Sequence, residues 1–314
     1  MRAFAIDEFG QVGSIRELPE PVPGDGEVLV QVRAAGVSTT DIAVMAGMLK
    51  DYLEHKFPLV PGIDVSGVVE RVGPGADGFR EGDEVYGFVQ RPVMGLGTWA
   101  ERVALPVGGI KRKPASLSHE QAAVIAHGAL TAAAAMDAAA AGPGDRLALL
   151  GATGGVGSYA TQLAAKAGVH VIGVTRGDYA DYAHSLGAED VIDYTATEPV
   201  EAVRERYPDG IDALIDLVGI PELSSGFADL VHSGGRVVSA IMPPDVEGLA
   251  ARGVEGILAN RMLAEHRFPE IAARITEGEI RIPNLQTFSF EDVGAALELQ
   301  ATRHVKGKLA VVMG

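Results

Sequence analysis

The sequence predicts an α/β protein in which a β-rich domain is followed by a doubly wound parallel sheet. Three observations support this fold class. Residues 151–157 form a glycine-rich turn between an apolar strand and a helix, and further apolar strands follow at the spacing of βαβ units. Residues 1 to about 120 instead alternate short strands with turn signals. A chain of 314 residues is long enough for two such domains.

The glycine-rich turn is the most informative segment. Residues 146–150 are predicted as a buried parallel strand, and the turn Gly151-x-x-Gly154-x-x-Gly157 leads straight into a helix. Such a turn bends tightly and lets a pyrophosphate approach, while the helix N-terminus offers N–H groups and a partial positive charge. Glycines alone are weak evidence, but between strand and helix they predict dinucleotide binding, with a purely structural turn as the alternative. The same loop contains the predicted contact residues Thr153, Gly155 and Val156.

The second strand of this sheet, residues 170–175, predicts which dinucleotide binds. In dinucleotide folds, an acidic residue at the end of this strand accepts the 2′-hydroxyl of NAD, whereas a nearby arginine pairs with the 2′-phosphate of NADP. Here the strand ends with Thr175 and Arg176, which offer a hydroxyl and a guanidinium fork. Asp178 is expected to cap the next helix. These residues favour NADPH, and the alternative is a solvated arginine on a loop.

Three more strands are expected at residues 190–193, 211–218 and 235–241. Ligands of parallel sheets bind beyond the carboxyl ends of the strands. Val218, Ala240 and Ile241 should therefore lie near the cofactor, although each is equally plausible as core.

Composition narrows the function classes. The net charge of −16 argues against nucleic acid or an anionic membrane as a partner, and the absence of cysteine excludes disulfides and thiolate chemistry. The first residues lack the apolar core of a signal peptide. The alanine-rich stretch 122–141 is predicted as a buried helix rather than a membrane span. We expect a soluble, cytoplasmic protein.

The β-rich part and the C-terminal tail complete the outline. Strands are expected at residues 28–32, 65–72, 84–89 and 98–104. Residues 261–278 are predicted to be helical, and residues 307–313 are predicted as a strand that returns to the first domain. Trp99 is expected in the core of that domain.

A series of short motifs then indicates a family. They lie, in order, at residues 23–30, 35–41, 57–69, 79–87, 97–101, 130–132, 186–188 and 306–308. With these motifs the chain resembles the zinc-independent medium-chain dehydrogenases/reductases of the quinone oxidoreductase branch, the zeta-crystallin-like proteins. The resemblance runs along nearly the whole chain.

The resemblance implies a GroES-like catalytic domain at residues 1–120, completed by residues 263–314, and a Rossmann domain at residues 121–262. It also implies NADPH-dependent reduction of quinones or of C=C bonds conjugated to a carbonyl, as in enones and enals. Relatives in this branch are commonly homodimers that pair through the edge of the nucleotide-binding domain. The alternative function is a crystallin-like or regulatory protein that holds NADPH with little turnover.

The residues argue against zinc. Zinc-dependent relatives have a cysteine where Ser38 stands here and a Gly-His-Glu run where this chain has Gly62-Ile63-Asp64. The eight histidines show no ligand-type spacing. Without a Lewis acid, alcohol oxidation is disfavoured, whereas hydride addition to an already polarised enone or quinone needs less assistance. No metal site is expected.

By resemblance, residues 38–52 line the substrate site. Ser38, where the family usually has asparagine, is a candidate hydrogen-bond donor to the substrate oxygen, and Tyr52 is a candidate proton donor. Asp41 matches a family aspartate whose role is as plausibly structural as catalytic. Ala43 and Leu49 stand where quinone reductases often have tyrosines, which shifts weight from quinones toward enones and enals.

Three more cofactor contacts are carried over from the family. Thr131 matches a threonine near the nicotinamide, and its alternative is a hydroxyl inside a helix. Tyr194 matches a tyrosine beside the adenosine phosphate, and its alternative is packing at a strand end. Lys308 is expected either to reach a phosphate or to be an ordinary surface lysine.

Overall fold

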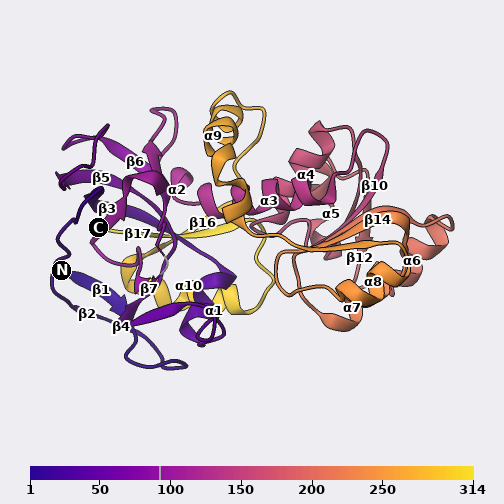
Figure 1. Ribbon diagram of the computed structural model, residues 1–314, viewed down its shortest axis with the longest axis horizontal. Helices are drawn as coiled ribbons and strands as arrows, with labels where there is room; N and C mark the ends of the chain where they lie inside the picture. Colours follow the sequence, from indigo (N-terminus) through magenta and orange to yellow (C-terminus); the bar gives the residue numbers. More distant parts are fainter. Residues whose placement is uncertain (92) are drawn as a thin grey trace. The chain divides into compact units, whose positions relative to one another are not determined.

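The computed structural model describes residues 1–91 and 93–314, which form two compact units (Figure 1). Unit 1 comprises Met1–His127 and Asn284–Gly314, and unit 2 comprises Gly128–Pro283. The expected outline assigned residues 263–283 to the first domain, but the structure includes them in unit 2. The Gln162 amide explains the difference, because it donates to the Arg281 carbonyl at 3.0 Å and accepts from the Arg281 N–H at 2.8 Å.

Unit 1 is built on a seven-stranded sheet with the order β16-β17-β3-β5-β6-β9, in which β8 also pairs with β3. These strands are β3 (Glu27–Val37), β5 (Asp64–Val72), β6 (Glu84–Phe88), β8 (Arg102–Pro106), β9 (Ile110–Arg112), β16 (Leu285–Ser289) and β17 (Lys308–Val312). The C-terminal strand β17 runs antiparallel to β3, with Leu309 opposite Val37. The predicted return of the tail to the first domain is therefore confirmed.

Smaller elements surround this sheet. Two further pairs are formed by β1 (Arg2–Ala5) with β2 (Ser14–Glu17), and by β4 (Glu54–Val60) with β7 (Val93–Leu96). The helices of the unit are α1 (Thr39–Met45), η1 (Val107–Gly109), α2 (His119–Ala122), η4 (Phe290–Asp292), α10 (Val293–Ala301) and the first residues of α3 (Ala126–Ala139).

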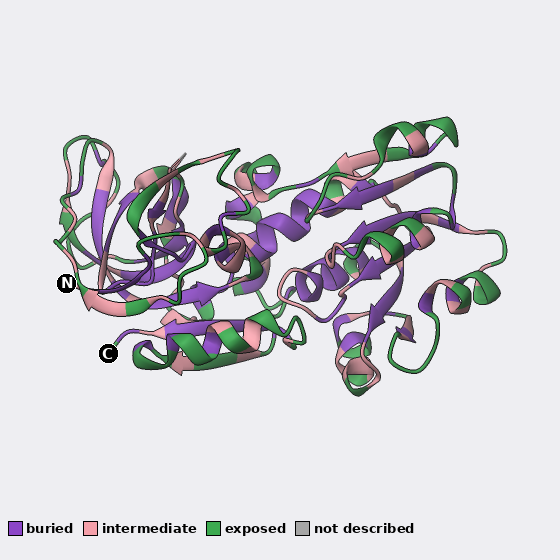
Figure 2. Ribbon diagram, turned by 90° about the horizontal axis from the view of Figure 1, so that it is seen from below, coloured by how far each residue is buried: buried purple, intermediate pink, exposed green. Residues whose placement is uncertain are grey.

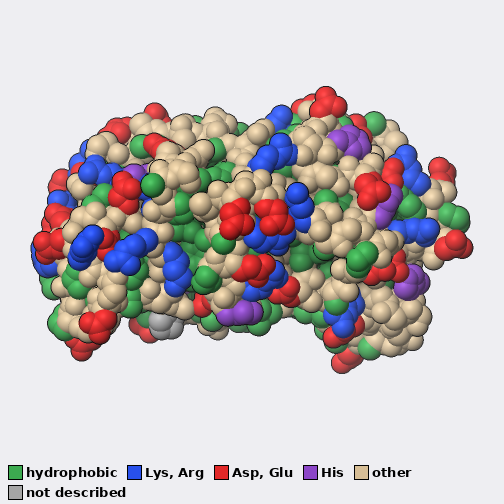
Figure 3. Space-filling model, turned by 90° about the horizontal axis from the view of Figure 1, so that it is seen from above, with side chains coloured by type: hydrophobic (Ala, Val, Ile, Leu, Met, Phe, Trp, Pro, Cys, Tyr) green, Lys and Arg blue, Asp and Glu red, His purple; other side chains and the backbone are tan. Residues whose placement is uncertain are grey.

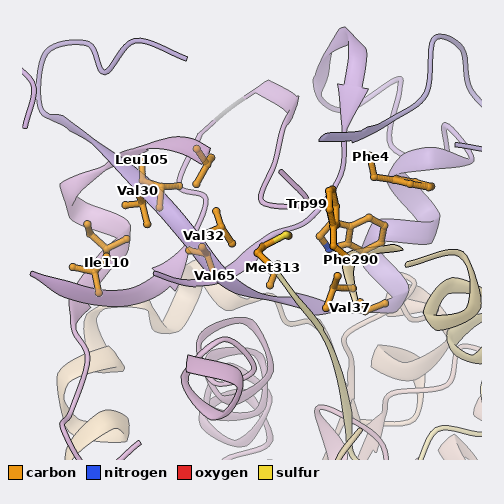
Figure 4. Packing of buried hydrophobic residues seen from close by; sticks show 14 of the residues in the cluster. Phe4, Val30, Val32, Val37, Val65, Trp99, Leu105, Ile110, Phe290 and Met313 are labelled. Atoms are coloured by element: carbon orange, nitrogen blue, oxygen red, sulfur yellow. The ribbon is translucent and has the colours of Figure 1, made fainter. Parts of the chain in front are cut away.

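The core of unit 1 is formed by the apolar residues of β3, β5 and β8 with side chains from both ends of the chain (Figure 4). Trp99 is fully buried, its indole N–H donates to the Gly36 carbonyl at 3.0 Å, and its ring meets Phe4 edge-on at 5.8 Å between centroids. The prediction that Trp99 packs in this core is confirmed. The predicted strand 98–104 begins later, at Arg102, because Trp99 turns inward before the ladder starts.

Unit 2 contains a six-stranded parallel sheet with the order β12-β11-β10-β13-β14-β15. Its strands are β10 (Arg146–Leu150), β11 (His170–Thr175), β12 (Asp190–Asp193), β13 (Ile211–Asp216), β14 (Val231–Ser239) and β15 (Glu255–Leu258). Its helices are the rest of α3, α4 (Gly157–Lys166), η2 (Gly177–Tyr179), α5 (Ala180–Leu186), α6 (Pro199–Arg206), α7 (Pro221–Ala228), α8 (Val246–Ala251), η3 (Arg261–Arg267) and α9 (Phe268–Thr276). Helices α4 and α5 cover one face of the sheet, and α6, α7 and α8 cover the other (Figure 1).

The arrangement of layers follows from the apolar strands. The middle strands are buried on both faces, while the outward sides of the covering helices are exposed (Figure 2). The predicted strands 146–150, 170–175 and 190–193 have the observed bounds, and the doubly wound parallel sheet is confirmed. The predicted helix 122–141 is observed as α2 and α3 around a break at residues 123–125.

Two surface properties bear on the expected partners. His119–Ala139 is the one helical stretch among the described residues that is long and apolar enough to cross a membrane, and 83% of its most apolar window is buried within the protein, as in a core helix. On the face shown in Figure 3, acidic and basic side chains are interspersed.

Candidate functional site

The order of the parallel strands locates the cofactor site. Strand order reverses between β10 and β13, and ligands of doubly wound sheets bind at this switch point beyond the carboxyl ends of the strands. The glycine loop follows β10 there, and the Leu217–Gly219 loop follows β13. A side chain at Gly151 would lie 3.1 Å from the Val218 methyl, so the two loops are neighbours. Gly219 in turn packs against Ile241, which follows β14.

The three glycines of the motif serve different purposes. Gly151 has φ of +80°, a conformation that L side chains rarely adopt. A Cβ at Gly157 would lie 2.0 Å from the Gly151 carbonyl oxygen, so α4 can approach β10 only without a side chain there. A Cβ at Gly154 would lie 3.4 Å from its nearest neighbour, an ordinary contact, and the φ of Gly154 is negative. Folding therefore does not require glycine at position 154, whereas close approach of a pyrophosphate does.

The loop also presents hydrogen-bond donors. Gly154, Gly155 and Val156 are partly exposed at the start of α4. Among the described residues, no acceptor is recorded for the N–H groups of Gly155 and Val156. Donors of this kind at a helix N-terminus bind anions. The residues present therefore fit the pyrophosphate of a dinucleotide.

Buried hydroxyls hold this loop in place. The Thr153 and Thr175 hydroxyls lie 2.6 Å apart and are both buried, and the Ser158 hydroxyl donates to the Thr153 carbonyl at 3.1 Å. Thr175 was expected to offer its hydroxyl to a phosphate, but the structure pairs it with Thr153. Its role in this arrangement is to join the glycine loop to the end of β11. Ser158 and its partner Tyr182 had not been expected from the sequence.

Arg176 lies directly after β11 with one-third of its side chain exposed. Its Nε donates to Asp178 Oδ1 at 3.1 Å, and its guanidinium carbon lies 5.9 Å from the centre of the Tyr179 ring. Asp178 was expected to cap a helix, but it lies within η2 and pairs with Arg176 instead. Because Asp178 engages only Nε, the terminal nitrogens of Arg176 remain available as a fork for a phosphate.

Tyr194 follows the neighbouring strand β12. Its N–H donates to the Thr175 carbonyl at 3.2 Å, which ties the ends of the two strands together. Partial burial raises the pKa of the Tyr194 phenol, while the charge of Arg176 opposes this shift. The structure thus brings Thr175, Arg176 and Tyr194 to one end of the sheet, where the adenosine half of a dinucleotide would lie.

Two buried polar residues that sequence reasoning missed shape the loops after β13 and β14. Asp216 accepts from the N–H groups of Val218 and Gly219 at 2.8 and 3.0 Å. The Ser239 hydroxyl accepts from the Ile241 N–H at 3.2 Å. Each is the last residue of its strand, and a polar residue ending an apolar strand was the signal available in the sequence. Of the predicted residues at this edge, Val218 and Ala240 are partly exposed and Ile241 is 43% exposed.

In unit 1, Ser38 and Asp41 form a closed hydrogen-bond set at the start of α1. Asp41 Oδ2 accepts from the Ser38 N–H and from the Ser38 hydroxyl, both at 2.8 Å, and Oδ1 accepts from the Gly62 N–H at 3.1 Å. The single hydroxyl proton of Ser38 is therefore used by Asp41. Ser38 was expected to donate to a substrate oxygen, and in this arrangement it can only accept.

Asp41 is 1% exposed, and its protonation is sensitive to this environment. Burial raises the pKa of the Asp41 carboxyl to about 6, and the hydrogen bonds from Ser38 only partly offset that effect. The negative charge of Asp64 raises this pKa further, whereas Lys308 lowers it. Burial therefore outweighs the donors that surround the carboxylate.

A pH-dependent stability follows from this carboxyl. The pKa of Asp41 is higher in the folded chain than the ordinary 3.8. Its contribution to the free energy of unfolding is therefore complete below pH 3.8 and is lost as the pH rises through about 6. The free energy of unfolding of the wild type, minus that of Asp41→Asn, is expected to fall by about 3 kcal/mol between roughly pH 4 and pH 7. Urea unfolding at several pH values measures this difference. Parallel curves for the two proteins would contradict it.

The other predicted residues are placed as follows. Tyr52 is 82% exposed in the turn before β4, so the structure does not enclose it in a pocket. Thr131 is buried inside α3. Lys308 was expected to reach a phosphate or the surface, but it is 4% exposed in unit 1, with its Nζ 3.8 Å from Asp64 Oδ2. Pairing with the buried Asp64 carboxylate explains its burial.

The acidic and histidine side chains bear on the expected absence of a metal site. Within residues 1–91 and 93–314, there is no group of three or more histidine, aspartate or glutamate side chains arranged to hold a metal ion. Zinc independence stays a prediction.

Comparison with known proteins extends over the whole chain. Residues 24–186 match the family described as alcohol dehydrogenase GroES-like domain, and residues 186–311 match the family described as zinc-binding dehydrogenase. The human mitochondrial NAD(P)H oxidoreductase RTN4IP1 is 31% identical, over 99% of this chain and 89% of its own length. The 2-methylene-furan-3-one reductase of Solanum lycopersicum is 32% identical, over 78% of this chain and 64% of its own length.

A solved structure agrees with these matches. The quinone oxidoreductase from Coxiella burnetii superimposes with a TM-score of 0.88 and 27% identity, covering 99% of both chains. Relatives named as NAD(P)H oxidoreductases support a nicotinamide cofactor, in keeping with the glycine loop. By its two family matches and its full-length relatives, the chain belongs to the medium-chain dehydrogenase/reductase superfamily, in the quinone oxidoreductase branch.

Proposed function

We propose that this protein transfers a hydride from NADPH to the activated C=C bond of an enone or enal, or to a quinone, without zinc. The observation that carries the proposal is the site at the ends of β10 and β11. There, space at Gly154 and free N–H groups fit a pyrophosphate, and Arg176 offers its fork to a 2′-phosphate. The relatives named for furanone reduction and quinone oxidoreduction support the same acceptor classes.

The segment from α1 to β4 supports an apolar acceptor. Met48, Tyr52 and Phe57 all expose large apolar surfaces there. Ala43 and Leu49, at positions where quinone reductases often have tyrosines, leave the segment more aliphatic. Exposed apolar side chains grouped in one segment suit an uncharged carbonyl compound better than an anionic one.

The proposed reduction requires the protein mainly to bind and orient the cofactor and the acceptor. Bound NADPH supplies the hydride, and the carbonyl of an enone or quinone has already polarised the acceptor carbon. The chain must hold the cofactor by its phosphates, orient the acceptor and deliver a proton to the reduced product. The glycine loop and Arg176 perform the first task in this proposal.

The direct test is NADPH oxidation by the purified protein with a panel of enals, cyclic enones and quinones, with NADH assayed in parallel. We expect turnover that prefers NADPH, with enones or enals ahead of quinones. Turnover with NADH alone would contradict the cofactor assignment. Tight NADPH binding without turnover on any acceptor would contradict the reductase.

One observation favours a second candidate, a protein that holds NADPH with little turnover. The Ser38 proton is used by Asp41, and Tyr52 is 82% exposed, so neither residue is poised as a proton donor. This candidate predicts cofactor binding equal to that of a reductase, and the acceptor panel separates the two.

We also propose a homodimer formed through the edge of the unit 2 sheet. Strand β15 pairs only with β14 among the described strands. Beside it, Leu258 is 44% exposed, Met262 69% and Leu263 56%. An open edge flanked by apolar side chains is suited to pairing with a second copy.

We expect a solution mass of twice 32.6 kDa by light scattering. Leu258→Glu should yield monomer, and Val12→Glu, at an exposed position of unit 1, should not; a monomeric wild type would contradict the proposal.

A further inference from the structure

Helix α4 holds three successive carbonyl oxygens of the glycine-rich loop. The Thr161 hydroxyl donates to the Ala152 carbonyl at 3.1 Å. The Ser158 hydroxyl donates to the Thr153 carbonyl at 3.1 Å, and the Ser158 N–H donates to the Gly154 carbonyl at 2.8 Å. The carbonyls of residues 152–154 are therefore all directed toward α4.

The helix itself has no need of these two hydroxyls. Serine and threonine are less favourable than alanine inside a helix, and α4 already contains alanine at positions 160, 164 and 165. Ser158 and Thr161 are also fully buried, where a hydroxyl is costly unless it is hydrogen-bonded. Both hydroxyls donate to carbonyls of the loop, so the loop is where their effect is felt.

The planarity of the peptide bond then sets the direction of the N–H groups in the loop. In a trans peptide, an N–H points opposite to the carbonyl of the preceding residue. The N–H groups of Thr153 and Gly155 therefore point away from α4, because the carbonyls of Ala152 and Gly154 point toward it. A flipped peptide would replace an N–H on that side with a carbonyl oxygen, whose partial negative charge repels a phosphate. The contacts with α4 oppose such flips.

Further side chains keep Ser158 in a defined orientation. The Tyr182 hydroxyl donates to Ser158 Oγ at 3.3 Å, which leaves the single hydroxyl proton of Ser158 for the Thr153 carbonyl. Gln162 Nε2 donates to the Ser158 carbonyl at 2.9 Å and to the Arg281 carbonyl at 3.0 Å, and its Oε1 accepts from the Arg281 N–H at 2.8 Å. Both amide protons of Gln162 are thus used, and a flipped amide would set its oxygen against two carbonyls. Supporting contacts of this kind fix the geometry of the residues that they hold.

We propose that Ser158 and Thr161 are positioning residues for the pyrophosphate of NADPH, an inference that rests on the proposed cofactor binding. Neither side chain touches the pyrophosphate. Their hydroxyls hold the Ala152 and Thr153 carbonyls on the α4 side of the loop, so that N–H groups and not carbonyl oxygens face the ligand. The pyrophosphate is common to NADPH and NADH. The contribution of these hydroxyls is therefore independent of the 2′-phosphate and of Arg176.

The test is fluorescence titration of full-length variants with NADPH and with NADH. Thr161→Val keeps the shape of the side chain but removes the hydroxyl, and it is expected to raise the Kd for both cofactors about five- to tenfold. The ratio of the two Kd values should stay as in wild type. Ser158→Ala should have the same effect as Thr161→Val. Thr161→Ser retains a hydroxyl and should bind both cofactors within about twofold of wild type.

Thr98→Val is the matched control. Thr98 is also fully buried, and its hydroxyl donates to the Asp64 carbonyl at 2.9 Å in unit 1. Urea unfolding should show a loss of stability in both Thr98→Val and Thr161→Val, whereas only Thr161→Val should lose affinity for the cofactors. Adenosine 2′-phosphate, which lacks the pyrophosphate, should compete with NADPH for Thr161→Val at the same Kd as for wild type.

Three outcomes would count against the proposal in different ways. If Thr161→Val and Ser158→Ala bind NADPH as tightly as Thr98→Val does, the two hydroxyls do not position the loop. If Thr161→Val loses affinity for adenosine 2′-phosphate as much as for NADPH, its hydroxyl serves the structure of unit 2 and not the pyrophosphate. Wild-type protein that binds neither NADPH nor NADH would instead contradict the proposed cofactor site itself.

Discussion

Gly154→Ala is expected to weaken NADPH binding more than about tenfold while leaving the stability of the protein within about 1 kcal/mol of wild type. A Cβ at this position makes only an ordinary contact with the protein, at 3.4 Å, and the backbone conformation suits alanine. The methyl group would instead occupy the space into which a pyrophosphate must approach. The loss would therefore appear in binding and not in folding.

Gly157→Ala is the matched contrast within the same loop. Its Cβ would lie 2.0 Å from the Gly151 carbonyl oxygen and 2.9 Å from backbone atoms of Ala152, none of which can rotate away. Overpacking of this kind costs about 1–3 kcal/mol or more, so both stability and binding should fall. Gly294→Ala, with open space around its Cβ, should change neither.

Urea unfolding without cofactor and fluorescence titration with NADPH separate these effects. If Gly154→Ala binds NADPH as tightly as wild type, the loop does not hold the pyrophosphate in the proposed way. If Gly154→Ala instead unfolds at a much lower urea concentration, glycine at this position serves the fold and is not reserved for a ligand.

The nucleotide-binding unit was predictable because its signals are local. A parallel strand buried on both faces is a continuous apolar run, so residues 146–150, 170–175 and 190–193 could be bounded from sequence alone. The spacing of the glycines likewise located the switch point at the end of the strand formed by residues 146–150. The short strands β9 and β15 have only one and two apolar side chains, too few to stand out in the sequence, and they form because neighbouring strands complete their ladders.

The candidate site was less predictable because its polar residues are paired over long sequence distances. The ion pair of Lys308 with Asp64, more than 200 positions away, could not be predicted from the sequence, where Lys308 was assigned to a phosphate or to the surface. Ser38 is a different case, because its partner Asp41 is only three positions away, and the use of the Ser38 proton depends on the rotamer of the Ser38 side chain. The contact between Thr40 Oγ1 and His127 Nε2 again joins distant positions, 87 apart, and no spacing rule predicts it.

Arg176→Ala is expected to raise the Kd for NADPH about 10- to 100-fold and to change the Kd for NADH less than about threefold. A hydrogen-bonded charge on a phosphate contributes about 1.5–3 kcal/mol, and only NADPH carries the 2′-phosphate. Arg204→Ala removes an arginine of the same unit that is paired with Glu201, and it controls for the change in net charge. Equal losses for the two cofactors would contradict the phosphate contact, because an arginine that merely orders the loop after β11 would affect both.

A substitution of Asp178 distinguishes two interpretations of Arg176. Its carboxylate holds Arg176 Nε at 3.1 Å, which orients the fork, but its negative charge also opposes a phosphate bound nearby. Asp178→Asn keeps a hydrogen-bond acceptor of the same shape and removes the charge. If Arg176 faces a 2′-phosphate, this variant should bind NADPH several-fold more tightly and NADH unchanged. If the pair with Asp178 is the sole purpose of Arg176, the variant should leave both affinities where they were, and the preference for NADPH would need another source in the chain.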